Sequence, residues 1–102
     1  MSETVDCNSI DDVRSNIDRI DRHLVTLLAE RGRYVKQAAR FKKTSDDVKA
    51  PQRVEQVIDK VIALSKELGA NAVVTEQVYR AMITAFINVE LIEHEALGSG
   101  AS

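Results

Sequence analysis

The sequence has few residues that break helices or cross-link a chain. Its 102 residues include one proline, four glycines and one cysteine, Cys7. A lone cysteine forms no disulfide within the chain, which excludes a disulfide-stabilised scaffold. The N-terminal residues MSETVDCNS lack the apolar stretch of a secretory signal, and no apolar run approaches the roughly 20 residues of a membrane span. We therefore expect a cytoplasmic protein that does not enter the membrane.

An excess of positive charge is also missing. The net charge is −2, whereas proteins that bind nucleic acids or membrane surfaces usually have a basic excess, so we expect neither partner. Apolar residues make up 44% of the chain, which is enough for a packed core. The length suits one small domain near the lower limit for folding alone, which makes oligomerisation worth considering.

Helical periodicity dominates the first half of the chain. Apolar residues recur at steps of three and four, and Ser9 with Asp12 fits an N-terminal capping pattern. The spacing predicts one helix from about residue 10 to residue 42. Its apolar stripe comprises Ile10, Val13, Ile17, Ile20, Leu24, Leu27, Val35 and Ala38, with Arg31 and Lys42 in the same series.

Two shorter helices are expected in the second half. The polar segment 42–51, KKTSDDVKAP, predicts a loop that ends at a proline suited to a first helical turn. Helices are predicted over 52–68, with Gly69 as the stop signal, and over 72–97. The expected boundaries are a flexible N-terminus over 1–8, one helical domain over 9–97 and a disordered tail over 98–102.

The length of the first helix predicts a dimer. A helix of about 33 residues is about 50 Å long, longer than a globule of this chain length is wide. The two shorter helices of one chain cannot cover its whole apolar stripe. We therefore predict an all-α fold with one long and two shorter helices per chain, in which two chains pack their long helices together.

Three ionisable residues fall on faces that are predicted to be buried: Arg31, Lys42 and Glu90. Each alone is most simply an ion-paired or snorkelling residue, or a partner of the helix dipole. Together they suggest a site in which two cations, about three turns apart, converge on one small ligand. Arg14 lies too far along the same helix, but an antiparallel partner helix would bring it close to the other chain's site. Three cations favour a small dianion, since guanidinium groups match carboxylates.

Other catalytic patterns are missing from the sequence. It contains no Ser-His-Asp pattern, no metal-spaced cysteines or histidines and no glycine-rich phosphate loop. We expect neither a metal nor a cofactor. His23 and His94 are predicted to be surface residues, and the aromatic residues are predicted to belong to the core, with Phe86 as a possible wall of the site.

The sequence resembles a known family. The segments DDVRSNIDRID, LLAERGRYVKQAARFK and APQRVEQVI, within roughly residues 8–97, are similar to the all-helical chorismate mutases of the AroQ class. They are most similar to the short branch that includes isochorismate-pyruvate lyase. The resemblance implies an intertwined homodimer of three-helix chains without a cofactor, with two active sites that each take an arginine from the partner chain.

The resemblance also implies roles for individual residues. Arg14 would reach into the neighbour's site, and Arg31 would clamp a substrate carboxylate. Lys42 would donate to the ether oxygen of the substrate and to a nearby carboxylate. Arg53, on the second predicted helix, would bind a substrate carboxylate. Glu90 stands where many relatives have glutamine and other mutases of this class have glutamate.

The implied reaction is the conversion of chorismate to prephenate. This [3,3] sigmatropic rearrangement needs a held conformer and donors aimed at the breaking ether bond, and it needs no nucleophile. Two alternatives remain open. An isochorismate-pyruvate lyase would form salicylate and pyruvate in the same cationic pocket. A non-enzymatic helical dimer would act as a binding module, with the charges on the apolar stripe setting its register.

Overall fold

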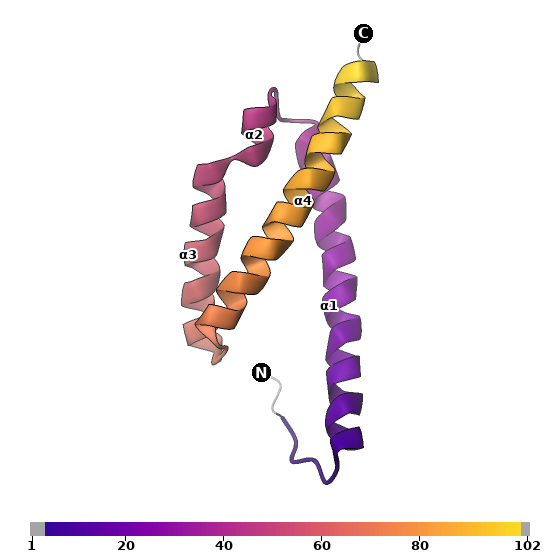
Figure 1. Ribbon diagram of the computed structural model, residues 1–102, viewed down its shortest axis with the longest axis vertical. Coiled ribbons are helices and arrows are strands. Elements are labelled where there is room, and N and C mark those ends of the chain that lie inside the picture. Colours follow the sequence, from indigo (N-terminus) through magenta and orange to yellow (C-terminus); the bar gives the residue numbers. More distant parts are fainter. Residues whose placement is uncertain (1–3, 101–102) are drawn as a thin grey trace. The chain divides into compact units, whose positions relative to one another are not determined.

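The computed structural model describes residues 4–100, with side chains as far as Leu97. Figure 1 shows that the described residues form helices and no strand, which confirms the predicted all-α class. They divide into two units, one ending at Arg33 and the other beginning at Tyr34. The helices are α1 (Ile10–Ala39), α2 (Ser45–Lys49), α3 (Pro51–Leu68) and α4 (Ala72–Gly100).

The beginning of α1 is capped as predicted. The Ser9 hydroxyl accepts a hydrogen bond from the backbone N–H of Asp12 at 3.1 Å, and the Asp12 carboxylate accepts one from the N–H of Asn8 at 3.3 Å. The first bond satisfies a backbone donor that the first helical turn leaves without a partner, and the second ties Asn8, which precedes the cap, to the same turn. From Ile10 to Arg33 the first unit is a single helix, and its apolar stripe is exposed, with Ile17 49% and Leu27 58% accessible.

The end of α1 differs from the prediction. The helix ends at Ala39, so Lys42 does not lie on its face but in the connection that follows. Phe41 and Lys42 continue the chain with tight turn bonds from their N–H groups to the carbonyls of Ala38 and Ala39, at 3.0 and 3.4 Å. An α-helix would next need the N–H of Lys43 to bind the carbonyl of Ala39. That N–H binds the Asp47 carboxylate instead, at 3.1 Å.

The segment predicted to be a loop contains the short helix α2. Thr44 caps it: its hydroxyl accepts from the N–H of Asp47 at 3.1 Å, and the Asp47 carboxylate accepts from the N–H of Thr44 at 3.1 Å. This reciprocal arrangement is a capping box. The bonds from the N–H groups of Lys43 and Thr44 lower the pKa of Asp47, because they stabilise its ionised form. The helix packs against α4, and Val48 is its buried residue.

A strained residue joins α2 to α3. Ala50 has φ 36° and ψ 62°, in the left-handed region, and its N–H donates to the carbonyl of Asp46 at 3.0 Å. Pro51 follows as the first residue of α3, where its missing N–H costs nothing. The helix therefore begins one residue before the predicted start at residue 52, and it ends at Leu68 as predicted, with Gly69 at φ 77°.

The core of the second unit lies between α3 and α4. These helices pack against each other as an antiparallel pair joined by a short turn (Figure 1). The buried apolar residues at this core are Ile58, Val61 and Ile83, with Val48 and Ala39 buried beside them in the same unit. The buried Ser65 hydroxyl donates to the carbonyl of Val61 at 2.8 Å, so it leaves no unsatisfied donor in the core.

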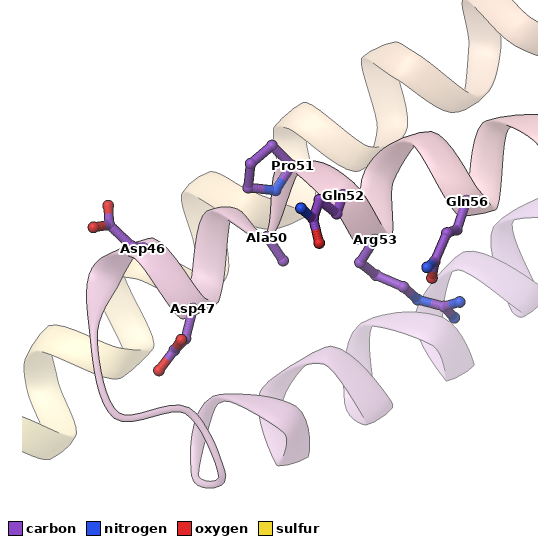
Figure 2. A pocket seen from close by; sticks show the side chains of 7 residues that line it. All are labelled: Asp46, Asp47, Ala50, Pro51, Gln52, Arg53 and Gln56. Carbon is purple, nitrogen blue, oxygen red and sulfur yellow. The ribbon is translucent and has the colours of Figure 1, made fainter.

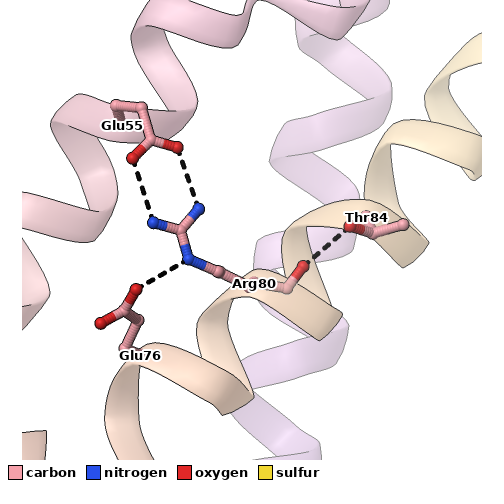
Figure 3. A network of polar contacts seen from close by, with 4 residues as sticks. All are labelled: Glu55, Glu76, Arg80 and Thr84. Atoms are coloured by element: carbon pink, nitrogen blue, oxygen red, sulfur yellow. Dashed lines mark hydrogen bonds and ion pairs between the residues drawn. The ribbon is translucent and has the colours of Figure 1, made fainter. Parts of the chain in front are cut away.

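A charged network ties α3 to α4 on the surface (Figure 3). The Arg80 guanidinium donates to both carboxylate oxygens of Glu55, at 2.9 and 3.0 Å, and its Nε donates to Glu76 at 2.9 Å. The hydrogen bond from Arg80 lowers the pKa of Glu55. Because the pKa is lowered, the contact stabilises the fold at pH values above the pKa that Glu55 has in the unfolded chain. This stabilisation is lost as the pH falls and Glu55 is protonated.

The C-terminal end of α4 also differs from the expectation. The helix extends to Gly100 and overlaps the tail predicted over 98–102, and residues 101 and 102 lie outside the described residues. The flexible segment predicted over 1–8 falls partly on residues 1–3, which also lie outside them. Within the part of the chain that the structure describes, no helix is long and apolar enough to cross a membrane.

Candidate active site

Two of the predicted site residues meet in the second unit. The Lys42 ammonium lies 2.7 Å from Oε1 of Glu90, which links the connection after α1 to the middle of α4. The side chain of Glu90 is 6% accessible and that of Lys42 is 27% accessible. Burial of a carboxylate is costly unless a counter-charge accompanies it, and Lys42 supplies that charge.

The hydrogen bonding of Glu90 is incomplete. Its Oε1 atom has no donor of suitable angle among the described residues, although the ammonium lies at ion-pair distance. Coulomb attraction depends on distance and tolerates this poor angle, so the ion pair stands while the hydrogen bond does not. A buried oxygen in this state can accept or, if protonated, donate a bond to a ligand.

His94 joins the same group, contrary to its predicted surface position. Its ring Nε2 lies 2.8 Å from the backbone carbonyl oxygen of Lys42, and the residue is half-buried. His94 follows Glu90 by four residues on α4, which places both side chains on one face of that helix. This spacing was the sequence signal for His94.

Arg53 lies in the first turn of α3 and lines a hollow of about 410 Å³ (Figure 2). The other lining residues come from α2 and from the start of α3. Figure 2 shows the Arg53 side chain beside that of Gln56, with Asp46 and Asp47 at the far end of the hollow. The guanidinium is exposed, so a carboxylate ligand can reach it without displacing the core.

Arg14 and Arg31 belong to the first unit. Both lie on α1, where Arg14 is exposed and Arg31 is half-buried. The predicted convergence of Arg31 and Lys42 rested on a shared helix face, and Lys42 lies outside the helix. The arrival of Arg14 from a partner chain stays a prediction, as does the convergence of the three cations.

The arrangement in the second unit suits a reaction without covalent steps by the protein. An ammonium and a carboxyl group stand side by side, so one ligand atom can meet a cationic donor and a group that exchanges one proton. Among the described residues no three histidine, cysteine or carboxylate side chains gather as a possible metal site.

Comparison with known proteins identifies the family. The model of the chorismate mutase type II family matches residues 13–91. Isochorismate pyruvate lyase of Pseudomonas aeruginosa is 34% identical over 87 residues, which cover 85% of this chain and 86% of that protein. The bifunctional chorismate mutase/prephenate dehydratase of Aquifex aeolicus is 30% identical over 83 residues, which cover 78% of this chain and 23% of that protein. The chain therefore belongs to the chorismate mutase type II family, as the resemblance of its sequence indicated.

Proposed function

We propose that this chain is a chorismate mutase that converts chorismate to prephenate without a cofactor. The observation that carries the proposal is the ion pair of Lys42 with the buried Glu90 in a member of this family. The reaction breaks an ether bond while a carbon–carbon bond forms in the same step. The protein therefore has to hold the reactive chair-like conformer and to stabilise negative charge on the ether oxygen.

The proposed roles follow from the charge of each group. Lys42 donates to the ether oxygen and to a neighbouring substrate carboxylate. Glu90, in its protonated form, donates to the same ether oxygen, because an ionised carboxylate would only accept. Arg31 and Arg53 bind the substrate carboxylates, and Arg14 enters the site from the partner chain. A guanidinium can donate two parallel hydrogen bonds to one carboxylate. Each arginine would therefore orient the substrate as well as neutralise its charge.

The proposal includes a homodimer built on α1. Between residues 10 and 33 this helix carries an exposed apolar stripe, with Leu24 53% and Leu27 58% accessible in the single chain. Exposed stripes of this length are unusual on monomers and typical of interfaces. A second copy, antiparallel on α1, would cover the stripe and deliver Arg14. Sedimentation should show a dimer, and a folded, active monomer would refute the shared site.

A second candidate is the lyase reaction on isochorismate, which yields salicylate and pyruvate. It is favoured by the relative from Pseudomonas aeruginosa, of which the chain covers 86%, whereas it covers 23% of the bifunctional mutase. The two candidates share a dianionic enolpyruvyl ether as substrate. A third possibility, a helical dimer that only binds a partner, predicts no turnover of either compound.

One assay separates the three. Purified protein is incubated with chorismate and, separately, with isochorismate, and prephenate, salicylate and pyruvate are measured. Prephenate from chorismate supports the mutase, and salicylate with equimolar pyruvate supports the lyase. Lys42→Ala, purified in parallel, is the control for contaminating host enzymes, because activity that survives this change does not come from the proposed site.

A further inference from the structure

The peptide bond between Lys42 and Lys43 is held at both of its polar atoms. Its carbonyl oxygen lies 2.8 Å from Nε2 of His94, on α4. Its N–H donates to the Asp47 carboxylate, on α2, at 3.1 Å. The connection after α1 is therefore fixed to two helices at one peptide plane, although it has no regular structure of its own.

Lys42 is attached to α4 at two separate points. The backbone carbonyl meets His94, and the side-chain ammonium meets Glu90 at 2.7 Å. The two α4 residues are four positions apart and share a face of the helix. The lysine stem is flexible, so the ammonium is confined only when both its backbone and its head group are held, as His94 and Glu90 hold them here.

The hydrogen bond requires His94 to be the donor. A carbonyl oxygen only accepts, so Nε2 must carry the proton, either in the neutral Nε2–H tautomer or in the cation. A glutamine at position 94 can supply an amide N–H at similar reach. A phenylalanine keeps the ring size and loses the donor.

We propose that His94 is a positioning residue for Lys42: by donating Nε2–H to the Lys42 carbonyl, it fixes the backbone from which the ammonium reaches the substrate. The inference rests on the proposed function for its kinetic consequence, but the hydrogen bond itself does not. Small displacements of a catalytic group are costly, and a misplacement of 1 Å can lower a rate about 100-fold.

The kinetic test compares His94→Phe with His94→Gln, using whichever substrate the wild-type protein turns over. In His94→Phe we expect kcat to fall by about tenfold with KM changed less than about twofold, because the lost order affects a group that acts in the transition state. We expect His94→Gln to retain kcat within about threefold, because it restores the donor. Glu95→Gln, an exposed neighbour on α4, is the matched control and should behave as wild type.

A spectroscopic test needs no substrate. In NMR spectra of the wild-type protein, Nε2 of His94 should carry the proton, and in His94→Phe the carbonyl carbon of Lys42 should shift upfield while the ammonium of Lys42 loses its ordered signal. His94→Gln should restore both signals. All variants should have the melting temperature of the wild-type protein if the effect is positional and not a loss of fold.

The outcomes are distinguishable. If the wild-type protein turns over a substrate and His94→Phe keeps its kcat, the positioning role is wrong. It is also wrong if His94→Gln is as impaired as His94→Phe. If the wild-type protein turns over neither substrate, the proposed function fails, and the NMR signals of Lys42 then decide the positioning role alone: unchanged signals in His94→Phe overturn it.

Discussion

In the proposed site, a substrate would compete with Glu90 for the ammonium of Lys42. In the described structure the ammonium faces a carboxylate at 2.7 Å. A dianionic substrate would bring its own carboxylate to the same ammonium, and it would then stand beside Glu90. In the proposed role Glu90 is protonated in the complex, so this repulsion is absent and the carboxyl group donates. The proposal thus makes a protonated Glu90 a condition of catalysis.

Removal of either proposed cation should abolish most of the catalysis, and the helical fold should persist, with lower stability in Lys42→Ala because the buried Glu90 loses its counter-charge. We expect Lys42→Ala and Arg31→Ala each to lower kcat/KM by at least about 100-fold, which corresponds to about 3 kcal/mol of transition-state stabilisation. Steady-state kinetics with circular dichroism measure both properties. Lys43→Ala and Arg33→Ala are matched controls, since they remove a neighbouring exposed cation. Equal losses in the controls would indicate an effect of net charge and not of position.

Glu90→Gln tests the protonated-donor role. Glutamine donates a hydrogen bond at any pH, whereas the carboxyl donates only with its proton. Glu90→Gln should therefore keep activity in steady-state rate measurements, because its amide supplies the proposed donor. A glutamine variant without activity would leave Glu90 as the structural partner of Lys42.

At the scale of elements, the sequence predicted the helices with regular periodicity and missed the one without it. The stripes and stop signals predicted α3 and the start of α4, and the cap at Ser9 predicted the start of α1. The helix α2 has five residues, too few for a periodic pattern. Its signal was the capping pair of Thr44 with Asp47 three residues later, which lies in a run of polar residues that is typical of a loop.

The sequence prediction also placed Lys42 on α1, whereas the helix ends at Ala39. The spacing extended α1 by three residues because Lys42 fits the step of four after Ala38, and periodicity alone gives no reason to stop there. The reason lies in a tertiary contact and a local cap: His94 donates to the Lys42 carbonyl, and the Asp47 carboxylate accepts from the N–H of Lys43. The pairing of Lys42 with Glu90 was open at the level of sequence, because it depends on how α2 and the connection pack against α4.

The capping box of α2 should depend on pH. Because bonds from the N–H groups of Lys43 and Thr44 lower the pKa of Asp47, the box contributes stability above the pKa of an unfolded aspartate, about 4, and loses it as pH falls through the lower folded value. In NMR titrations the amide protons of Lys43 and Thr44 should move together as Asp47 is protonated. Asp47→Asn should remove this transition. Amide shifts that stay constant down to pH 2 would contradict the cap.

At the scale of the whole molecule, the exposed stripe of α1 and the position of Arg14 both bear on the proposed homodimer. A guanidinium at residue 14 is seventeen residues from Arg31, about 25 Å along one helix, so one small ligand cannot touch both in the same chain. In an antiparallel pair of α1 helices that cross near residue 24, Arg14 of one chain falls near Arg31 of the other. The stripe around Leu24 and Leu27 would then be the contact surface.

Mixing two inactive variants tests whether the site is shared. Arg14→Ala chains and Arg31→Ala chains are unfolded together and refolded, so that about half of the dimers contain one chain of each kind. In such a heterodimer one pocket carries both substitutions and the other keeps both arginines. Activity should therefore return to about a quarter of the wild-type value per site, with each variant alone inactive. Refolded wild-type protein controls for losses in the procedure. A mixture as inactive as its parents would place Arg14 outside the partner's site, because a site built within one chain has no intact copy to recover.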